Sequence, residues 1–120
     1  MSNEEEIWQL VDKKKDEYIN FSDRVFDTPE ILYQEFKSAA EHTLMLKKEG
    51  FKITEGICHM PTAVMGEYGD AGPIIAILGE FDALPGLSQE AGIADHKPIK
   101  NISIIGADIV RSFTIIELFK

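Results

Sequence analysis

Cysteine is almost absent from this sequence, which contains one, Cys58, among its 120 residues. A disulfide within the chain is therefore excluded, and this favours a reducing compartment. No apolar run is long enough to cross a bilayer. The opening residues, MSNEEEIWQL, lack the basic and apolar regions of a signal peptide. We therefore expect a cytoplasmic protein.

Basic residues are also scarce. The chain has 12 Lys and Arg against 21 Asp and Glu, which gives a formal net charge of −9. This excess of negative charge argues against nucleic acid and anionic membranes as partners. The apolar content of 44% is ordinary for a protein with a core, and the length suits one domain or part of one.

The first half of the chain is predicted to form two helices. Apolar residues recur at helical spacing over residues 4–26, and DKKKDE fills the opposite face. The lysines at 13–15 are either an anion-binding patch or a solvated helix face, and the flanking acids favour the solvated face. A second helix is expected to begin at Pro29, after a Thr28 cap, and to end before Gly50.

Three short apolar segments follow the helices. FKIT (residues 51–54) alternates like a short strand, TAVMGEYG (residues 62–69) is interpreted as a second strand, and GDAGP is typical of a turn. IIAIL (residues 74–78) has no polar face, which is typical of a central strand covered on both sides. Two helices followed by a mixed sheet predict an α/β fold, the N-terminal portion of a layered domain.

Candidate metal-binding side chains are few and scattered. Cys58 and His59 are adjacent, but neighbours in an extended segment point in opposite directions and chelate one ion poorly. His42 lies in the second predicted helix, where a lone histidine is more often structural or solvated than a ligand. His96 is interpreted as a loop residue.

Two acids, Glu80 and Asp82, follow the apolar run at 74–78. If the strand geometry continues, both point to the same side, where they would repel each other without a cation between them. Ligands bind beyond the carboxyl ends of strands in open α/β sheets, so these acids are candidates for a metal site. The alternative is a capped turn, in which Asp82 bonds loop amides and Glu80 lies in water.

The longer stretch ILGEFDALPGLSQEAG resembles the first signature of the zinc-dependent aminoacylase and carboxypeptidase family of peptidases. Within that family it is most similar to the aminobenzoyl-glutamate utilization protein B branch, the p-aminobenzoyl-glutamate hydrolases. The upstream FDTPEILYQEFKSAAEHTLMLKKEGFKI, with its pair Tyr33 and Glu35, resembles the same branch. The resemblance covers residues 7–99.

The resemblance implies a catalytic α/β domain with a smaller inserted dimerisation domain, so that the full-length family forms homodimers. It also implies two metal ions, usually zinc, and a glutamate that activates water to hydrolyse an amide bond beside a free carboxylate. Many members have a His-x-Asp signature, in which the histidine binds metal and the aspartate orients the histidine. Asp82 matches the orienting acid. Glu80 occupies the position of the histidine, and the similar branch takes its metal ligands from later motifs.

The tail, KNISIIGADIVRSFTIIELFK, departs from the family pattern. The resemblance implies a His-x-Cys-Gly-His motif and a Glu pair there, and the tail contains neither. Residues 1–99 are therefore interpreted as the N-terminal part of a catalytic domain, and residues 100–120 as a divergent tail. One explanation is a frameshift near Lys100, because codons for Gly106 to Ile109 can encode Cys-Gly-His in another frame. The other is a true short chain whose tail forms a new strand and helix.

The sequence thus predicts a truncated amidohydrolase with no complete metal site and no activity of its own. Its full-length family acts on small-molecule amides such as N-acyl amino acids, dipeptides or aminobenzoyl-glutamate. Two alternatives stay open. The chain is either a non-catalytic remnant or small interaction module, or one component of an enzyme that a separately encoded chain completes.

Overall fold

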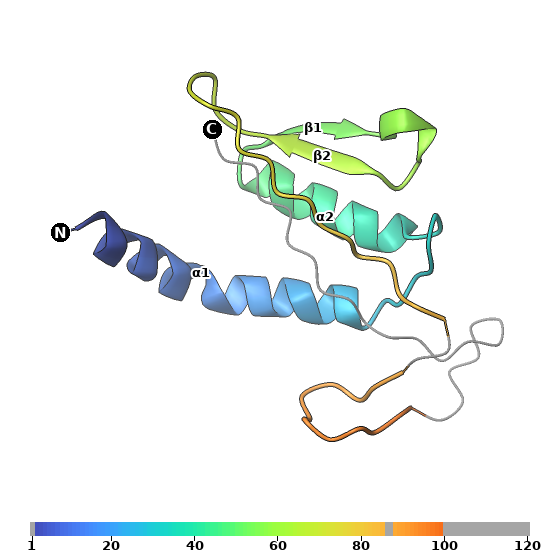
Figure 1. Cartoon of the computed structure of the whole chain (residues 1–120). Coiled ribbons are helices and arrows are strands. Elements are labelled where there is room, and N and C mark those ends of the chain that lie inside the picture. Colours follow the sequence, from blue (N-terminus) through green and yellow to red (C-terminus); the bar gives the residue numbers. More distant parts are fainter. Residues whose placement is uncertain (1, 86–87, 100–120) are drawn as a thin grey trace.

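The computed structural model describes residues 2–85 and 88–99. Helix α1 (Asn3–Phe26) and helix α2 (Phe36–Lys48) are followed by strand β1 (Lys52–Glu55), a 3-10 turn η1 (Ile57–His59) and strand β2 (Val64–Glu67). Figure 1 shows α2 lying between α1 and the hairpin of β1 and β2. The helix-then-sheet order confirms the predicted α/β class. In the part of the chain described, no helix is long and apolar enough to span a membrane.

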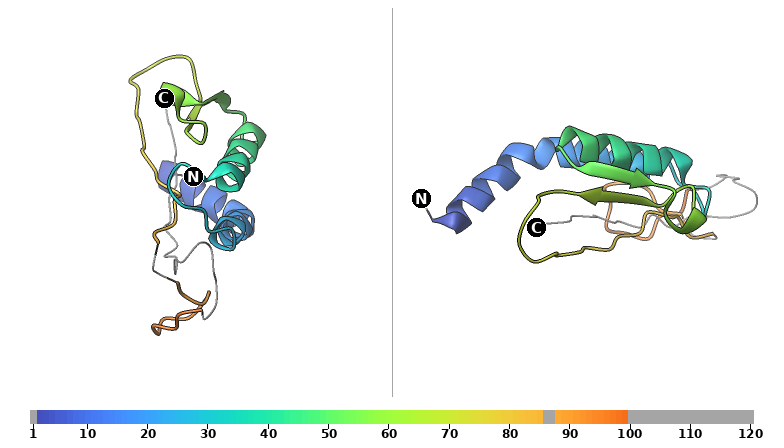
Figure 2. Two further views of the ribbon diagram at one scale, coloured as in Figure 1. Left: turned by 90° about the vertical axis from the view of Figure 1, so that its right-hand side faces the viewer. Right: turned by 90° about the horizontal axis from the view of Figure 1, so that it is seen from above.

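Helix α1 starts at a capping box. The Ser2 hydroxyl accepts a hydrogen bond from the Glu5 amide at 3.3 Å, and the Glu5 carboxylate accepts one from the Ser2 amide at 2.8 Å. The predicted helix over residues 4–26 is confirmed. None of its residues is buried, and its N-terminal half extends beyond the end of α2 (Figures 1 and 2).

Helix α2 begins at Phe36 rather than at Pro29, so the predicted start was wrong. The reason lies in the segment before it. Ile31 forms a parallel bridge with Ala83, and Tyr33 has a left-handed φ of 65°, so the chain between Pro29 and Phe36 cannot be helical. Tertiary pairing with a distant segment thus overrides a good local start signal.

The end of α2 was predicted correctly. Gly50 has a φ of 86°, and its amide donates to the Lys47 carbonyl at 3.1 Å. The Phe51 amide donates to the Leu46 carbonyl at 3.0 Å. This pair of bonds is the Schellman motif, which requires a left-handed residue that glycine adopts without strain.

Strands β1 and β2 form an antiparallel hairpin in which Lys52 pairs with Glu67 and Glu55 with Val64. One face of the hairpin packs on α2. Gly66 is buried there, and an added Cβ would lie 3.2 Å from the side chains of Leu46 and Phe51. The two predicted strands are confirmed. Strand β1 is shifted by one residue from the predicted segment at 51–54, and β2 is shorter than the predicted segment at 62–69.

The prediction of a buried central strand at residues 74–78 was wrong. The segment contains one isolated bridge residue and no strand, and Ile74 and Leu78 are 80% and 91% exposed. A central strand needs hydrogen-bonded neighbours on both sides. The sheet in the described part of the chain has only β1 and β2, which pair with each other, so nothing there buries this run. The predictions for residues 100–120 lie outside the described residues.

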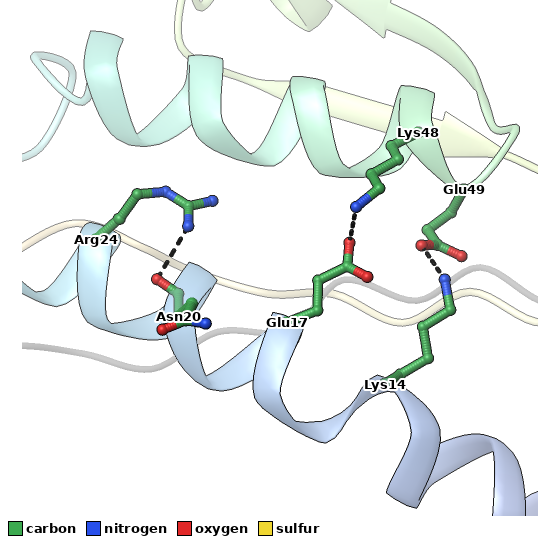
Figure 3. Close-up of polar contacts among 6 residues, drawn as sticks. All are labelled: Lys14, Glu17, Asn20, Arg24, Lys48 and Glu49. Carbon is green, nitrogen blue, oxygen red and sulfur yellow. Dashed lines mark hydrogen bonds and ion pairs between the residues drawn. The ribbon is translucent and has the colours of Figure 1, made fainter.

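Ion pairs join the two helices (Figure 3). Lys14 bonds the Glu49 carboxylate and Lys48 bonds that of Glu17. Arg24 also pairs at 2.9 Å with Glu41, which lies outside the set of residues drawn there. The bond to Glu49 raises the pKa of Lys14, and the bond to Lys48 lowers the pKa of Glu17. Glu17 therefore favours the folded state above its unfolded pKa and loses that contribution as pH falls through its folded pKa.

Candidate functional site

The segment GEFDALP, residues 79–85, docks against the loop that precedes α2. The Ala83 amide donates to the Glu30 carbonyl at 2.7 Å, and Ala83 forms the parallel bridge with Ile31. Ala83 is 4% exposed. Figure 1 shows the chain after β2 running along α2 to reach this point. We call residues 79–85 the docked segment.

An aromatic stack fixes the docked segment to both helices. The Phe81 ring stacks on the His42 imidazole with a centroid distance of 4.6 Å and an interplanar angle of 23°. On α1, Phe21 contacts the same imidazole edge-to-face at 4.9 Å. The His42 Nδ1–H donates to the Ser38 carbonyl at 2.8 Å, since a carbonyl can only accept. His42 is therefore a buried structural residue, one of the two roles expected for it.

The two predicted site acids lie on either side of Phe81 in the chain. Glu80 is exposed and Asp82 is half-buried, and neither follows a strand. The expected geometry, two acids at a strand end, is therefore wrong. Asp82 lies between Phe81, which stacks on His42, and Ala83, which pairs with Glu30. Its backbone position is consequently fixed relative to α2, whereas its predicted role as an orienting acid stays a prediction.

Glu30 supports the loop that receives the docked segment. Its carboxylate accepts hydrogen bonds from the Lys37 amide at 3.1 Å and the Ser38 amide at 2.8 Å, so it caps α2 from outside the helix. An acid near these free amides also stabilises the positive end of the helix. The predicted helix start at Pro29 placed Glu30 inside the first turn of the helix. A cap formed by Glu30 from outside the helix was therefore not predicted.

Glu35 is a buried carboxylate whose contacts were not predicted from the sequence. It is 5% exposed and accepts hydrogen bonds from the Thr62 hydroxyl at 2.7 Å and from the Tyr33 amide at 2.8 Å. Thr62 comes from the connection between β1 and β2, so this bond joins the hairpin to the start of α2. The sequence shows only that Glu35 is an acid near apolar residues. That observation does not identify Thr62, which lies far along the chain, as its hydrogen-bond partner.

The remaining candidate ligands do not come together. Cys58 and His59 are exposed in the turn η1, where both have positive φ, rather than in the extended segment that was expected. His96 is an exposed loop residue, as predicted. Over residues 2–85 and 88–99, no group of three or more His, Cys, Asp or Glu side chains is placed to hold a metal ion.

A cleft of about 450 Å³ lies between the two helices. It is lined by Glu17, Asn20, Arg24, Glu41, Leu44, Met45 and Lys48. Its charged side chains already pair with each other, Glu17 with Lys48 and Glu41 with Arg24. These pairs hold the helices together, so the cleft is part of the scaffold.

The chain is 37% identical over 94 residues to a p-aminobenzoyl-glutamate hydrolase subunit of Escherichia coli strain K12. The match covers 75% of this chain and 20% of the relative, so the chain spans about a fifth of the relative's length. No family model matches. No solved structure matches either. The resemblance to the p-aminobenzoyl-glutamate hydrolases that the signature predicted is therefore confirmed.

Proposed function

We propose that this chain is the N-terminal part of a cytoplasmic, metal-dependent amidohydrolase. The complete enzyme would hydrolyse an amide bond in a small carboxylate-bearing molecule of the aminobenzoyl-glutamate, N-acyl amino acid or dipeptide type. The observation that carries the proposal is the 37% identity over 94 residues to a protein named as a hydrolase of p-aminobenzoyl-glutamate.

The contribution of this chain would be the scaffold and one acid. The docked segment holds Asp82 beside α2, and Asp82 matches the acid that orients a metal ligand in the resembling family. The described residues do not themselves fit a metal ion, since no cluster of ligands forms among them. We propose that other residues of the complete homodimeric enzyme bind the zinc, and that the water-activating glutamate is also one of those residues.

The tail at 100–120 bears on whether this chain can complete such a site. We propose that the reading frame shifts near Lys100. Sequencing the coding DNA from the codon of Asp95 past that of Lys120 tests this. The hypothesis expects another frame to restore His-x-Cys-Gly-His and a Glu pair. A verified sequence with no such frame would refute it.

The 120-residue chain is expected to show no zinc-dependent amidase activity. Purified chain, incubated with Zn²⁺ and p-aminobenzoyl-glutamate, should release p-aminobenzoate no faster than a protein-free control. Chromatographic detection of p-aminobenzoate measures this directly. The relative from E. coli, assayed as its complete enzyme in parallel, is the positive control. Turnover that a chelator abolishes would show that the chain contains a working site after all.

A further inference from the structure

Residues 31–34 form a turn where the local sequence favours a helix. The Gln34 amide donates to the Ile31 carbonyl at 2.9 Å, which closes the turn. Within it Tyr33 has a φ of 65°, a left-handed conformation that turns normally give to glycine or asparagine. The preceding Thr-Pro pair, residues 28–29, is by contrast a good start signal for a helix. Local preference therefore opposes the conformation that this segment adopts.

Packing of the Tyr33 side chain does not explain its unfavourable backbone. The side chain is 59% exposed, so little is gained by burying the ring. A left-handed φ in a residue with a Cβ persists only where surrounding contacts hold it. The Glu35 carboxylate supplies such a contact, since it accepts a hydrogen bond from the Tyr33 amide at 2.8 Å. In a helix that began at Pro29, the Tyr33 amide would bond the Pro29 carbonyl instead. The bond to Glu35 thus favours the turn over the helix.

Thr62 fixes the Glu35 carboxylate from the other side. The Thr62 hydroxyl donates to the second carboxylate oxygen at 2.7 Å, and both residues are 5% exposed. A buried carboxylate is costly without hydrogen-bond donors, so its two donors determine where it lies. Thr62 belongs to the connection between β1 and β2. The hairpin therefore holds the carboxylate, and the carboxylate holds the turn.

The turn keeps open the edge on which the docked segment binds. Ile31 forms the parallel bridge with Ala83, and the Ala83 amide donates to the Glu30 carbonyl at 2.7 Å. A bridge of this kind needs extended backbone. In a helix through this region the Glu30 carbonyl would accept from the Gln34 amide instead. The same backbone consequently cannot both continue α2 and receive the docked segment.

We propose that Glu35 is a positioning residue for Asp82. Its carboxylate keeps residues 31–34 as a turn, the turn receives the docked segment, and the docked segment carries Asp82. Loss of the carboxylate lets α2 extend toward Pro29 and releases the docked segment. The link to catalysis rests on the function proposed above, whereas the link from Glu35 to the docked segment does not.

Circular dichroism and amide hydrogen exchange of the full 120-residue chain test the link to the docked segment. In Glu35→Ala the helical signal should strengthen by about a tenth, the share that one further turn adds to helices of 24 and 13 residues. The Ala83 amide should exchange about tenfold faster, because its bond to the Glu30 carbonyl is lost. A weaker helical signal or an unchanged Ala83 exchange rate would overturn the proposal.

Two single variants are the controls. Gln34→Ala raises helix propensity at an exposed position in the same turn and removes no buried carboxylate, so it should leave the Ala83 exchange rate unchanged. Glu35→Gln keeps an acceptor for the Tyr33 amide and a partner for the Thr62 hydroxyl, so it should retain the protection of Ala83. Equal acceleration in Gln34→Ala and Glu35→Ala would contradict the role of the carboxylate.

A second substitution separates loss of the turn from general damage. Glycine adopts a left-handed φ without strain and disfavours a helix. Glu35→Ala/Tyr33→Gly should therefore recover protection of the Ala83 amide, although the bonds to the carboxylate are still missing. An Ala83 amide that exchanges as fast in this double variant as in Glu35→Ala would overturn the role given to the turn.

A double-mutant cycle with Asp82 tests the link to catalysis. The host is a chimera in which residues 7–99 replace the matching segment of the E. coli relative. Glu35→Ala should lower kcat/KM for p-aminobenzoyl-glutamate about tenfold when Asp82 is present and less than about twofold beside Asp82→Ala, because no acid is then left to position. Equal losses in both backgrounds would overturn the positioning role. An inactive unsubstituted chimera would count against the proposed function, and the Ala83 exchange rate would still decide the link from Glu35 to the docked segment.

Discussion

Replacing Asp82 by alanine should lower kcat/KM for p-aminobenzoyl-glutamate about 10- to 100-fold in an enzyme that contains this chain's docked segment. The suitable enzyme is a chimera in which residues 7–99 replace the matching segment of the E. coli relative, assayed within the relative's complete enzyme. Carboxylates that orient metal ligands contribute effects of this size. Phe81 and Ala83 anchor the backbone of Asp82 on both sides, and this fixed position is the basis for expecting the loss.

A positioning role for Asp82 also predicts which quantities change: zinc affinity, kcat or KM. Asp82→Ala should lower zinc affinity and kcat with little change in KM, and Asp82→Glu should recover part of the activity. Glu80→Ala should have a smaller effect, since Glu80 is exposed, and Asp70→Ala is the matched control for an exposed loop acid. Equal loss of activity in all three alanine variants would contradict the assignment of Asp82. So would an Asp82→Ala enzyme with unchanged zinc affinity and kcat.

Replacing Phe81 by alanine should lower the free energy of unfolding by about 2 kcal/mol. Phe81 is half-buried and stacks on His42 at 4.6 Å, and the substitution removes both apolar contact and the aromatic pair. Urea unfolding of the 120-residue chain, followed by circular dichroism to report helix loss, measures the change. The docked segment should lose its aromatic anchor on His42, while the Ala83 pairing with Glu30 and Ile31 is kept.

Leu78→Ala is the control for the Phe81 substitution. Both residues are apolar and lie close together in the chain, but Leu78 is 91% exposed whereas Phe81 is half-buried against His42. Truncation of Leu78 should therefore change the free energy of unfolding by less than about 0.5 kcal/mol. A similar loss of stability in Leu78→Ala and Phe81→Ala would contradict the proposed anchoring.

Local signals in the sequence predicted local structure well. The amphipathic pattern of residues 4–26 predicted α1, and Gly50 predicted the end of α2. Both features depend on contacts between residues close in the sequence, so a short window of residues contains the necessary information. The α/β order of two helices followed by strands was predicted for the same reason.

Features that depend on distant contacts were not predicted. Helix α2 starts at Phe36 because Ile31 pairs with Ala83, and nothing near Pro29 signals that pairing. The run at 74–78 is apolar enough for a central strand, but burial requires neighbouring strands that the described part of the chain does not supply. The aromatic stack on His42 likewise joins segments whose proximity only the fold establishes.

The hydrolase activity of the unsubstituted chimera tests the central claim most directly. If residues 7–99 are the first part of an amidohydrolase scaffold, the chimera should release p-aminobenzoate from p-aminobenzoyl-glutamate, and a chelator should abolish that activity. A chimera that folds and assembles into a complete enzyme as the relative does, yet shows no hydrolysis of p-aminobenzoyl-glutamate above background, would contradict the claim.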